Sequence, residues 1–180
     1  MPRPAPDRIA LLEGLAAHVL RHGMAGASLR PLAASVGTSD RMLIYHFGTK
    51  EALLAEVLDH IARQLAAGLD AALPAQRMAR EADLVAAVIT LLRAPDVKPY
   101  VGLWFDILSA EAHRTGPSTG QGTGGPGAAI LRIYLDWIAD RHPDGEAGAE
   151  RCLALIEGLL VIETAGSPDM VDRIIAGLLG

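Results

Sequence analysis

Cysteine, aromatic residues and long hydrophobic runs are scarce or missing in this chain of 180 residues. Because Cys152 is the single cysteine, the chain can form no intrachain disulfide and no thiolate metal cluster, and we expect Cys152 to be a small core residue. No apolar run approaches the roughly 20 residues of a membrane-spanning helix, and the N-terminus lacks the apolar core of a signal peptide. The sequence therefore predicts a soluble, cytoplasmic protein that does not contact membranes.

Two further absences concern strands and catalytic motifs. The sequence has no run of alternating β-branched residues, whereas alanine and leucine, which favour helices, dominate its apolar residues. It also has no nucleophile elbow, HExxH motif or P-loop. We therefore expect an all-α protein that is not an enzyme, with no catalytic residue, no metal and no cofactor.

One glycine-rich segment matches a nucleotide-binding motif only in the spacing of its glycines. The run 116–127 contains Gly120-x-Gly122-x-x-Gly125, the spacing of the dinucleotide-binding fingerprint. That fingerprint requires a preceding strand within a parallel sheet, whereas a helix is predicted before this segment. We therefore expect a mobile loop that binds no nucleotide.

Charge is unevenly distributed along the chain, whose net charge is −5. Residues 1–50 contain six lysines and arginines against three acidic residues, a net charge of +3. The remaining 130 residues contain ten basic residues against eighteen acidic ones, a net charge of −8. A basic segment attracts phosphate groups and an acidic remainder repels them, so this distribution is typical of a DNA-binding domain joined to a second domain.

The stretch 28–54 predicts two short helices joined by a tight turn and followed by a third helix. Gly37 supplies the backbone freedom that the turn needs, and apolar residues on both sides of it recur with helical spacing. Polar residues suited to N-capping precede the three helices, namely Ser28, then Thr38 or Ser39, and then Thr49. With a supporting helix over 7–21, the pattern predicts a three-helix domain that contains a helix-turn-helix.

Four groups of residues in this stretch resemble the DNA-binding domain of the TetR family of bacterial transcriptional regulators. In chain order they are Leu32-Ala33, Gly37-Thr38-Ser39, Leu43-Ile44-Tyr45-His46-Phe47 and Lys50-Glu51-Ala52-Leu53-Leu54. The family usually has tyrosine at the position of Ile44, and in this chain Tyr45 follows directly. The resemblance covers about the first third of the chain. It implies a homodimeric regulator with a double-stranded DNA operator and a small-molecule effector.

A helix-turn-helix reads DNA with its second helix, whose N-terminal residues meet base edges in the major groove. In this chain that helix is expected over about 39–47. Arg41 can form a bidentate contact with guanine, and Lys50 opens a helix whose free backbone N–H groups attract phosphate. Arg30 and Arg41 could instead be solvated charges, and His46 a packing residue. The predicted DNA-binding residues are Ser28, Arg30, Ser39, Asp40, Arg41, Met42, Tyr45, His46 and Lys50.

The sequence predicts a DNA-binding domain at 1–50 and a helical domain for ligand binding and dimerisation at 51–180. Helical patterns in the second domain cover 50–73, 80–93, 97–113, 127–141, 147–165 and 168–179. Apolar residues surround most of the helices at 127–141 and 149–165, so one face can meet the core and another a partner subunit. The family pairs its last two major helices across a two-fold axis, which predicts a homodimer.

Aromatic residues gather in the helix at 97–113, where an apolar cavity with few polar anchors would suit a small molecule. Tyr100 and Trp104 are the predicted ligand-contacting residues, with a plain core position as the alternative. The polar residues of this helix, Asp106, Glu111 and His113, are expected to be solvated.

The leading hypothesis is a TetR-like repressor whose affinity for its operator falls when the ligand binds. One alternative is a helical partner-binding module that has lost sequence-specific DNA binding, because Ile44 replaces the usual tyrosine. Another is a small enzyme that uses the cavity of the second domain, because Ser109, Glu111 and His113 lie within one predicted helix.

Overall fold

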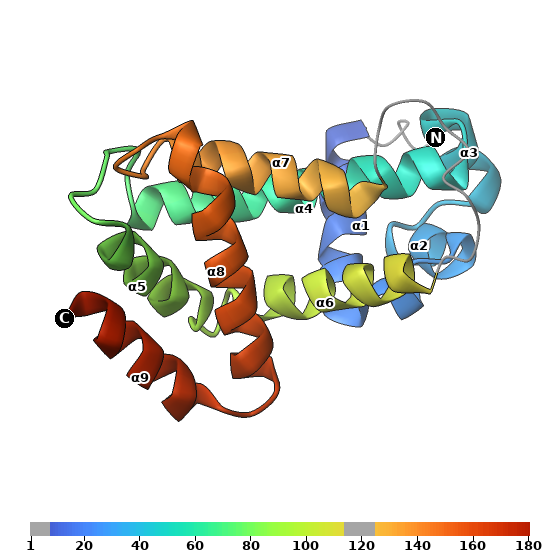
Figure 1. Cartoon of the computed structure of the whole chain (residues 1–180). Helices are drawn as coiled ribbons and strands as arrows, with labels where there is room; N and C mark the ends of the chain where they lie inside the picture. The colour runs from blue at the N-terminus through green and yellow to red at the C-terminus, as the bar shows by residue number, and fades with distance from the viewer. Residues whose placement is uncertain (1–7, 114–124) are drawn as a thin grey trace. The chain divides into compact units, whose positions relative to one another are not determined.

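The computed structural model of the chain describes residues 8–113 and 125–180, which contain helices and no strand (Figure 1). The all-α class predicted from the sequence is confirmed. In chain order the helices are α1 (Arg8–His22), η1, a short 3₁₀ helix (Met24–Gly26), α2 (Leu29–Ser35), α3 (Asp40–Phe47), α4 (Lys50–Ala72), α5 (Glu81–Leu92), α6 (Lys98–Ala112), α7 (Pro126–Ala139), α8 (Glu146–Thr164) and α9 (Pro168–Leu179). None of the described helices is both long and apolar enough to cross a membrane.

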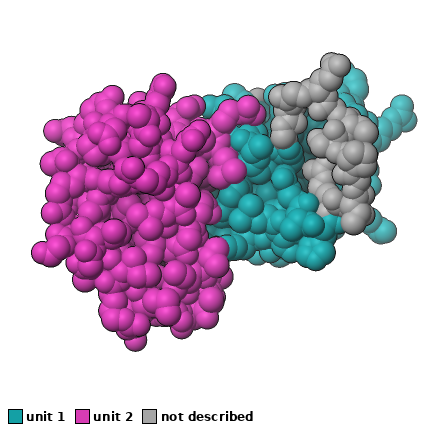
Figure 2. Space-filling view, viewed as in Figure 1, with its two compact units in different colours: residues 1–64, 99–130 teal, residues 65–98, 131–180 magenta. Residues whose placement is uncertain are grey.

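The chain forms two compact units, each built from two segments of sequence (Figure 2). The first unit comprises residues 1–64 and 99–130, and the second comprises residues 65–98 and 131–180. Both α4 and α7 therefore begin in the first unit and end in the second. These units reflect packing within the chain and do not test the predicted functional division into residues 1–50 and 51–180.

Three short helices and α1 contribute part of the core of the first unit, to which α4 and α6 also contribute. Leu11, Leu15 and Val19 recur four apart on one face of α1 and are at most 2% exposed. In this part of the unit, α1 packs against α2 and η1, and α2 packs against α3. Leu32 and Leu43, one from each helix of the helix-turn-helix, are fully buried. Each such side chain contributes about 1.5–3 kcal/mol by its removal from water.

In the second unit α5, α8 and α9 pack against one another in all three pairs. Arg93, at the end of α5, joins the other two helices. Its Nε and Nη2 donate to the carboxylate of Glu163 on α8 at 3.0 and 2.7 Å, and its Nη1 donates to Asp172 on α9 at 2.7 Å. These hydrogen bonds raise the pKa of Arg93, and the one to Glu163 has the largest effect. A bidentate hydrogen bond fixes the direction as well as the distance between a guanidinium and a carboxylate, so Arg93 orients α8 and α9 relative to the end of α5.

Arg141 is a buried charged residue of the second unit, and its side chain is 1% exposed. Its Nε donates to the carbonyl of Leu73 at 2.9 Å, its Nη1 donates to the carbonyl of Trp137 at 2.8 Å, and its Nη2 donates to the carboxylate of Asp70. The guanidinium also lies 3.8 Å from the centroid of the Trp137 ring. Arg141 thereby satisfies backbone carbonyls where α4 and α7 end.

Cys152 lies in α8 and is fully buried, as expected of a small core residue. Burial raises the pKa of its thiol to about 11, so the group is protonated at neutral pH. The expected loop at 116–127 is only partly observable, because Gly120 and Gly122 lie outside the described residues. Pro126 and Gly127 already belong to α7, since proline is well suited to the first turn of a helix.

Candidate nucleic-acid interface

Helices α2 and α3 form the predicted helix-turn-helix (Figure 1). Gly37 lies between them with a φ of 65°, a left-handed conformation that glycine adopts without strain. The N–H of Thr38 donates to the carbonyl of Ala33 at 2.9 Å and closes the end of α2. The position of the turn is therefore determined by residues within α2 and directly after it.

N-capping residues define where the helices of this region begin. The Oγ of Ser39 accepts a hydrogen bond from the N–H of Met42 at 3.3 Å, and the Oγ1 of Thr49 accepts one from Ala52 at 3.1 Å. Both caps agree with the sequence prediction. Ser28 occupies the N-cap position of α2, but its side chain makes no capping hydrogen bond.

The turn supports a paired prediction on stability. Gly37→Ala should lower the free energy of unfolding by about 1 kcal/mol, because alanine disfavours a left-handed backbone. A Cβ at Gly37 has no atom within 4 Å, so steric contact adds nothing to this cost. Gly102 is the matched control, since it lies inside α6 with equally open space and no positive φ. Gly102→Ala should raise the free energy of unfolding by about 1 kcal/mol. Urea unfolding of both variants measures the difference, and equal effects would contradict the conformational argument.

The face of α3 that is not packed in the core carries most of the predicted base-contacting residues. Asp40 and Arg41 are exposed, Met42 is 36% exposed and Tyr45 is 78% exposed. Ile44 is half-buried, so Tyr45 is the aromatic residue that α3 presents to solvent. The exposed residues lie within the first two turns of α3, the part of a recognition helix that meets base edges.

The cationic residues near α3 have different environments. Arg30, Arg41 and Lys50 are exposed and form no ion pair with any residue of 8–113 or 125–180. Arg8, in contrast, pairs with Glu56 at 2.5 Å and lies 5.0 Å from the centroid of a core phenylalanine ring. The charges of Arg30, Arg41 and Lys50 are therefore available to phosphate groups, whereas that of Arg8 is neutralised within the first unit.

His46 lies between the exposed and the buried faces of α3. Its ring stands edge-on to those of Tyr45 and Phe47, with centroids 5.4 and 6.5 Å away. Its Nε2 is buried and has no hydrogen-bond partner among the described residues. A phosphate contact through this atom therefore requires the ring to turn, and the DNA contact of His46 stays a prediction.

Asp106 on α6 contacts η1, the short helix that precedes the helix-turn-helix. Its carboxylate accepts a hydrogen bond at 3.1 Å from the N–H of Met24, the first residue of η1. A Cβ at Gly23 would lie 2.3 Å from the Oδ2 of Asp106, so the contact requires glycine there. The sequence indicated only a solvated carboxylate at this position, because the contact joins residues far apart in the chain.

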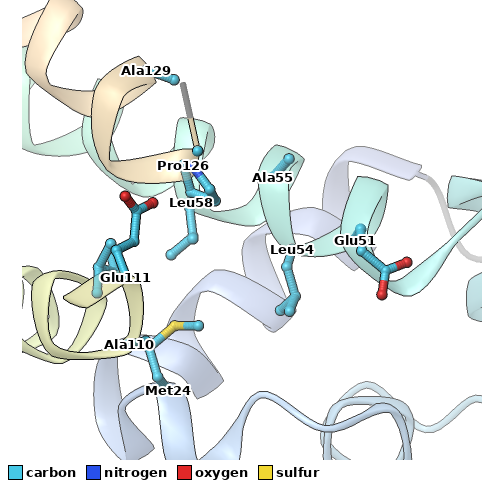
Figure 3. A pocket seen from close by; sticks show the side chains of 11 residues that line it. Met24, Glu51, Leu54, Ala55, Leu58, Ala110, Glu111, Pro126 and Ala129 are labelled. Atoms are coloured by element: carbon cyan, nitrogen blue, oxygen red, sulfur yellow. The ribbon is translucent and has the colours of Figure 1, made fainter. Parts of the chain in front are cut away.

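A cavity of about 540 Å³ lies in the first unit, between α4, α6 and the start of α7. Apolar side chains line most of it, together with two carboxylates (Figure 3). Glu111 turns its carboxylate toward α7 and accepts a hydrogen bond from Gly127 N–H at 2.9 Å, while Glu51 is exposed. The lining residues are Met24, Glu51, Leu54, Ala55, Leu58, Ile107, Ala110, Glu111, Gly125, Pro126 and Ala129.

The two residues predicted to contact a ligand lie on α6 but are not among the residues that line this cavity. Trp104 is buried and 7% exposed, and Tyr100 is half-buried. Their ligand contact stays a prediction. The sequence gave no indication that Met24 lines a cavity. It indicated Glu111 only as a solvated carboxylate, whereas Glu111 lines the cavity and accepts a hydrogen bond from Gly127 N–H.

Comparisons with known proteins agree with the helix-turn-helix. Residues 11–57 match the family model described as bacterial regulatory proteins, tetR family. A solved TetR-family member from Streptomyces coelicolor A3 superposes with a TM-score of 0.64 at 21% identity, covering 96% of this chain and 98% of that chain. A protein from Rhodococcus sp. assigned to the TetR-family transcriptional regulators superposes with a TM-score of 0.62 at 19% identity. The match covers 93% of this chain and 94% of that chain. No curated protein matches the chain.

These matches complement one another. The family model covers the first helices, including α2 and α3, and the solved structures extend the shared fold over nearly the whole chain. At such low identity the solved structures show the fold alone. The resemblance predicted from the sequence, and the helix-turn-helix domain within it, are confirmed.

Proposed function

We propose that this member of the TetR family of bacterial regulatory proteins is a homodimeric repressor whose operator affinity falls when a small molecule binds within residues 51–180. The observation that carries the proposal is the outer face of α3. It presents a base-reading set of side chains after a tight turn, in the segment that matches the family model. A recognition helix needs this combination of a rigid turn and an exposed N-terminal half.

The proposed contacts fall into two groups. Arg41, Met42 and Asp40 at the start of α3 meet base edges, where a bidentate arginine on guanine contributes about 1–3 kcal/mol of discrimination. Ser28, Arg30, Ser39, Tyr45, His46 and Lys50 contact the sugar-phosphate backbone or the neighbouring bases. Phosphate contacts position the protein on the duplex, and base contacts provide the sequence preference.

A binding assay on the DNA that flanks the coding region tests the proposal. We expect a retarded complex that persists against excess unrelated DNA and a footprint with two half-sites about 34–36 Å apart or a multiple of that distance. Binding that depends steeply on salt but not on sequence would contradict it, because it would show phosphate attraction without base reading.

Exposed apolar side chains support dimerisation through α8 and α9, in place of the helices at 127–141 and 149–165 that the sequence pattern indicated. Val161 on α8 is 53% exposed, and Met170 and Leu178 on α9 are 43% and 41% exposed. A second copy of the chain that covers these residues by two-fold symmetry would remove them from water. Two helix-turn-helix domains would then face the two halves of a palindromic operator.

The proposed interface predicts the effect of one charge. Val161→Glu should raise the dimer dissociation constant at least 10-fold, because an isologous interface would bury the new carboxylate twice. Sedimentation velocity over a range of concentrations measures this constant. Ala67→Glu is the control, since Ala67 is an exposed residue of α4, outside the two helices of the proposed interface, whereas exposed α8 residues such as Ala154 share the face of Val161. Equal dimerisation of the two variants would place the interface elsewhere.

The cavity of the first unit is the proposed effector site, and all its lining residues except Met24 lie within residues 51–180. Its volume lies within the range of about 300–1,000 Å³ that small-molecule sites usually have, and its lining is largely apolar. The carboxylates of Glu51 and Glu111 favour an effector with a positive charge or with hydrogen-bond donors. Because α4 starts directly after α3 and lines this cavity, a ligand that prefers one arrangement of α4 would change operator affinity.

A cavity-filling variant tests the effector site. A panel of amphipathic amines is first screened for compounds that raise the melting temperature of the wild-type protein. Ala55→Phe should then raise the concentration of such a compound that releases the operator by at least 10-fold, while operator affinity without ligand changes less than 2-fold. Ala67→Phe is the control, because Ala67 is an exposed residue of α4 outside the cavity. An unchanged response of Ala55→Phe would exclude this cavity.

A further inference from the structure

Three residues with metal-ligating side chains meet in the second unit. Glu81 is the first residue of α5, His142 lies in the turn between α7 and α8, and Cys152 lies in α8. One ligand atom from each of the three lies within 4.8 Å of the other two. The Nε2 of His142 is 3.7 Å from the Oε1 of Glu81. Neither the proposed DNA contacts nor the proposed effector cavity uses this cluster.

The imidazole of His142 has an unsatisfied nitrogen, Nε2, which lies near the carboxylate of Glu81. The side chain is completely buried, and its Nε2 has no hydrogen-bond partner among the described residues. Its Nδ1 accepts a hydrogen bond from the N–H of Asp144 at 3.0 Å, so a neutral ring carries its proton on Nε2. A buried donor without an acceptor is costly, and the distance to Glu81 is too long for a hydrogen bond.

The surrounding residues hold this ring in place. A Cβ at Gly148 would lie 1.9 Å from the Cε1 of His142, so the ring occupies space that only glycine leaves free. Glu81 is held by Arg151, whose Nη2 and Nε donate to its two oxygens at 2.9 and 3.3 Å. This hydrogen bonding from Arg151 lowers the pKa of Glu81, so its carboxylate is ionised at neutral pH. The cluster is a fixed arrangement of one oxygen, one nitrogen and one sulfur ligand.

We propose that Glu81, His142 and Cys152 bind a divalent transition-metal ion of the zinc type. Carboxylate, imidazole and thiolate are the ligands that zinc prefers, and three of them leave one tetrahedral position for water. Bond lengths of about 2.0–2.3 Å place tetrahedral ligands about 3.5 Å apart. Since all three ligand atoms lie within 4.8 Å of one another, no pair has to approach by more than about 1.3 Å. The separation of Glu81 and His142 already fits this geometry.

Metal binding requires two proton movements. The Cys152 thiol releases its proton to solvent, because only the thiolate is a good ligand. The proton of His142 moves from Nε2 to Nδ1, which can then no longer accept from the N–H of Asp144. Asp144 lies in an exposed turn, so its amide can turn toward water. The ion therefore replaces a buried, unpaired N–H with a coordinate bond.

The sequence did not indicate this site, because a single cysteine suggested that no thiolate site exists. That conclusion holds for clusters of several cysteines but does not exclude a mixed site. His142 and Cys152 are ten residues apart and Glu81 precedes them by about sixty residues, so the three show no ligand spacing within one motif. Only the packing of α5 against α8 brings Glu81 to the other two.

Titration of the full-length, chelator-treated protein with Co²⁺ tests the proposal. We expect one Co²⁺ per chain and a near-ultraviolet thiolate-to-cobalt absorption band. Cys152→Ala should abolish this band, and Glu81→Gln should weaken Co²⁺ binding by more than about 100-fold, since the loss of even an outer partner costs 10–100-fold. The matched control is His22→Gln, which removes an exposed histidine outside the cluster and should leave the band unchanged.

Two further readouts keep the test decisive. Circular dichroism establishes that each variant is folded, and Glu81→Gln alters a partly exposed side chain should Cys152→Ala fail to fold. In amide NMR spectra, Zn²⁺ should shift the Asp144 resonance and speed its hydrogen exchange. Absence of the thiolate band in the wild-type protein, or Co²⁺ binding that survives both Cys152→Ala and Glu81→Gln, would overturn the proposal.

Discussion

Replacement of Arg30, Tyr45 and Lys50 together by alanine should abolish sequence-specific operator binding without loss of the dimer. All three side chains are exposed on or near α3, and neither cation forms an ion pair among the described residues. Their replacement should therefore change the stability of the folded chain little. A loss of about 1 kcal/mol for each contact in each of two protomers amounts to about 6 kcal/mol, or more than 1,000-fold in affinity. Fluorescence anisotropy with a labelled operator measures the change.

A control with equal loss of charge separates DNA reading from general electrostatics. Lys98→Ala with Arg132→Ala also removes two exposed cations, but from the second unit and outside the helices of the proposed dimer interface. We expect this double variant to bind the operator within about 2-fold of the wild-type protein at 0.15 M salt, where the Debye length is about 8 Å. Equal losses for the two sets of substitutions would mean that net charge, rather than contact by the helix-turn-helix, determines binding.

The helix-turn-helix could be predicted from the sequence because its signals are local. Gly37 determines the turn, Ser39 caps α3, and Thr49 caps α4, and each acts on residues at most five positions away. The spacing of apolar residues then indicates which face of each helix is buried. Such features do not depend on the rest of the chain, so the predicted helices and the turn agree with the structure to within about one residue, although Ser28 makes no capping hydrogen bond.

Features that depend on distant residues could not be predicted in the same way. Asp106 and Glu111 were both expected to be solvated. Asp106 is exposed, as expected, but it also accepts a hydrogen bond from Met24 N–H, and the half-buried Glu111 accepts one from Gly127 N–H. His46 looked like a surface donor, but the packing of α3 buries its Nε2. Tertiary packing determines the hydrogen-bond partners of Asp106 and Glu111 and the burial of His46, and a periodic pattern does not encode this packing.

The largest effect on stability is expected for Arg141→Ala. The substitution removes hydrogen bonds to the carbonyls of Leu73 and Trp137 and to the carboxylate of Asp70, and it leaves a cavity beside the Trp137 ring. Two backbone carbonyls lose donors that a residue 1% exposed to solvent supplied, and water can replace those donors only in part. Together with the lost packing, we expect the free energy of unfolding to fall by about 3 kcal/mol.

Urea unfolding in the presence of a chelator measures this loss, with Arg151→Ala as the matched control. Arg151 also pairs with a carboxylate of the second unit, but its side chain is 70% exposed, so we expect a loss of at most about 1 kcal/mol. The comparison isolates burial, because both variants remove one guanidinium and one ion pair. If Arg141→Ala cost no more than Arg151→Ala, the carbonyls where α4 and α7 end would have to be solvated readily, and Arg141 would not be what joins these two helix ends.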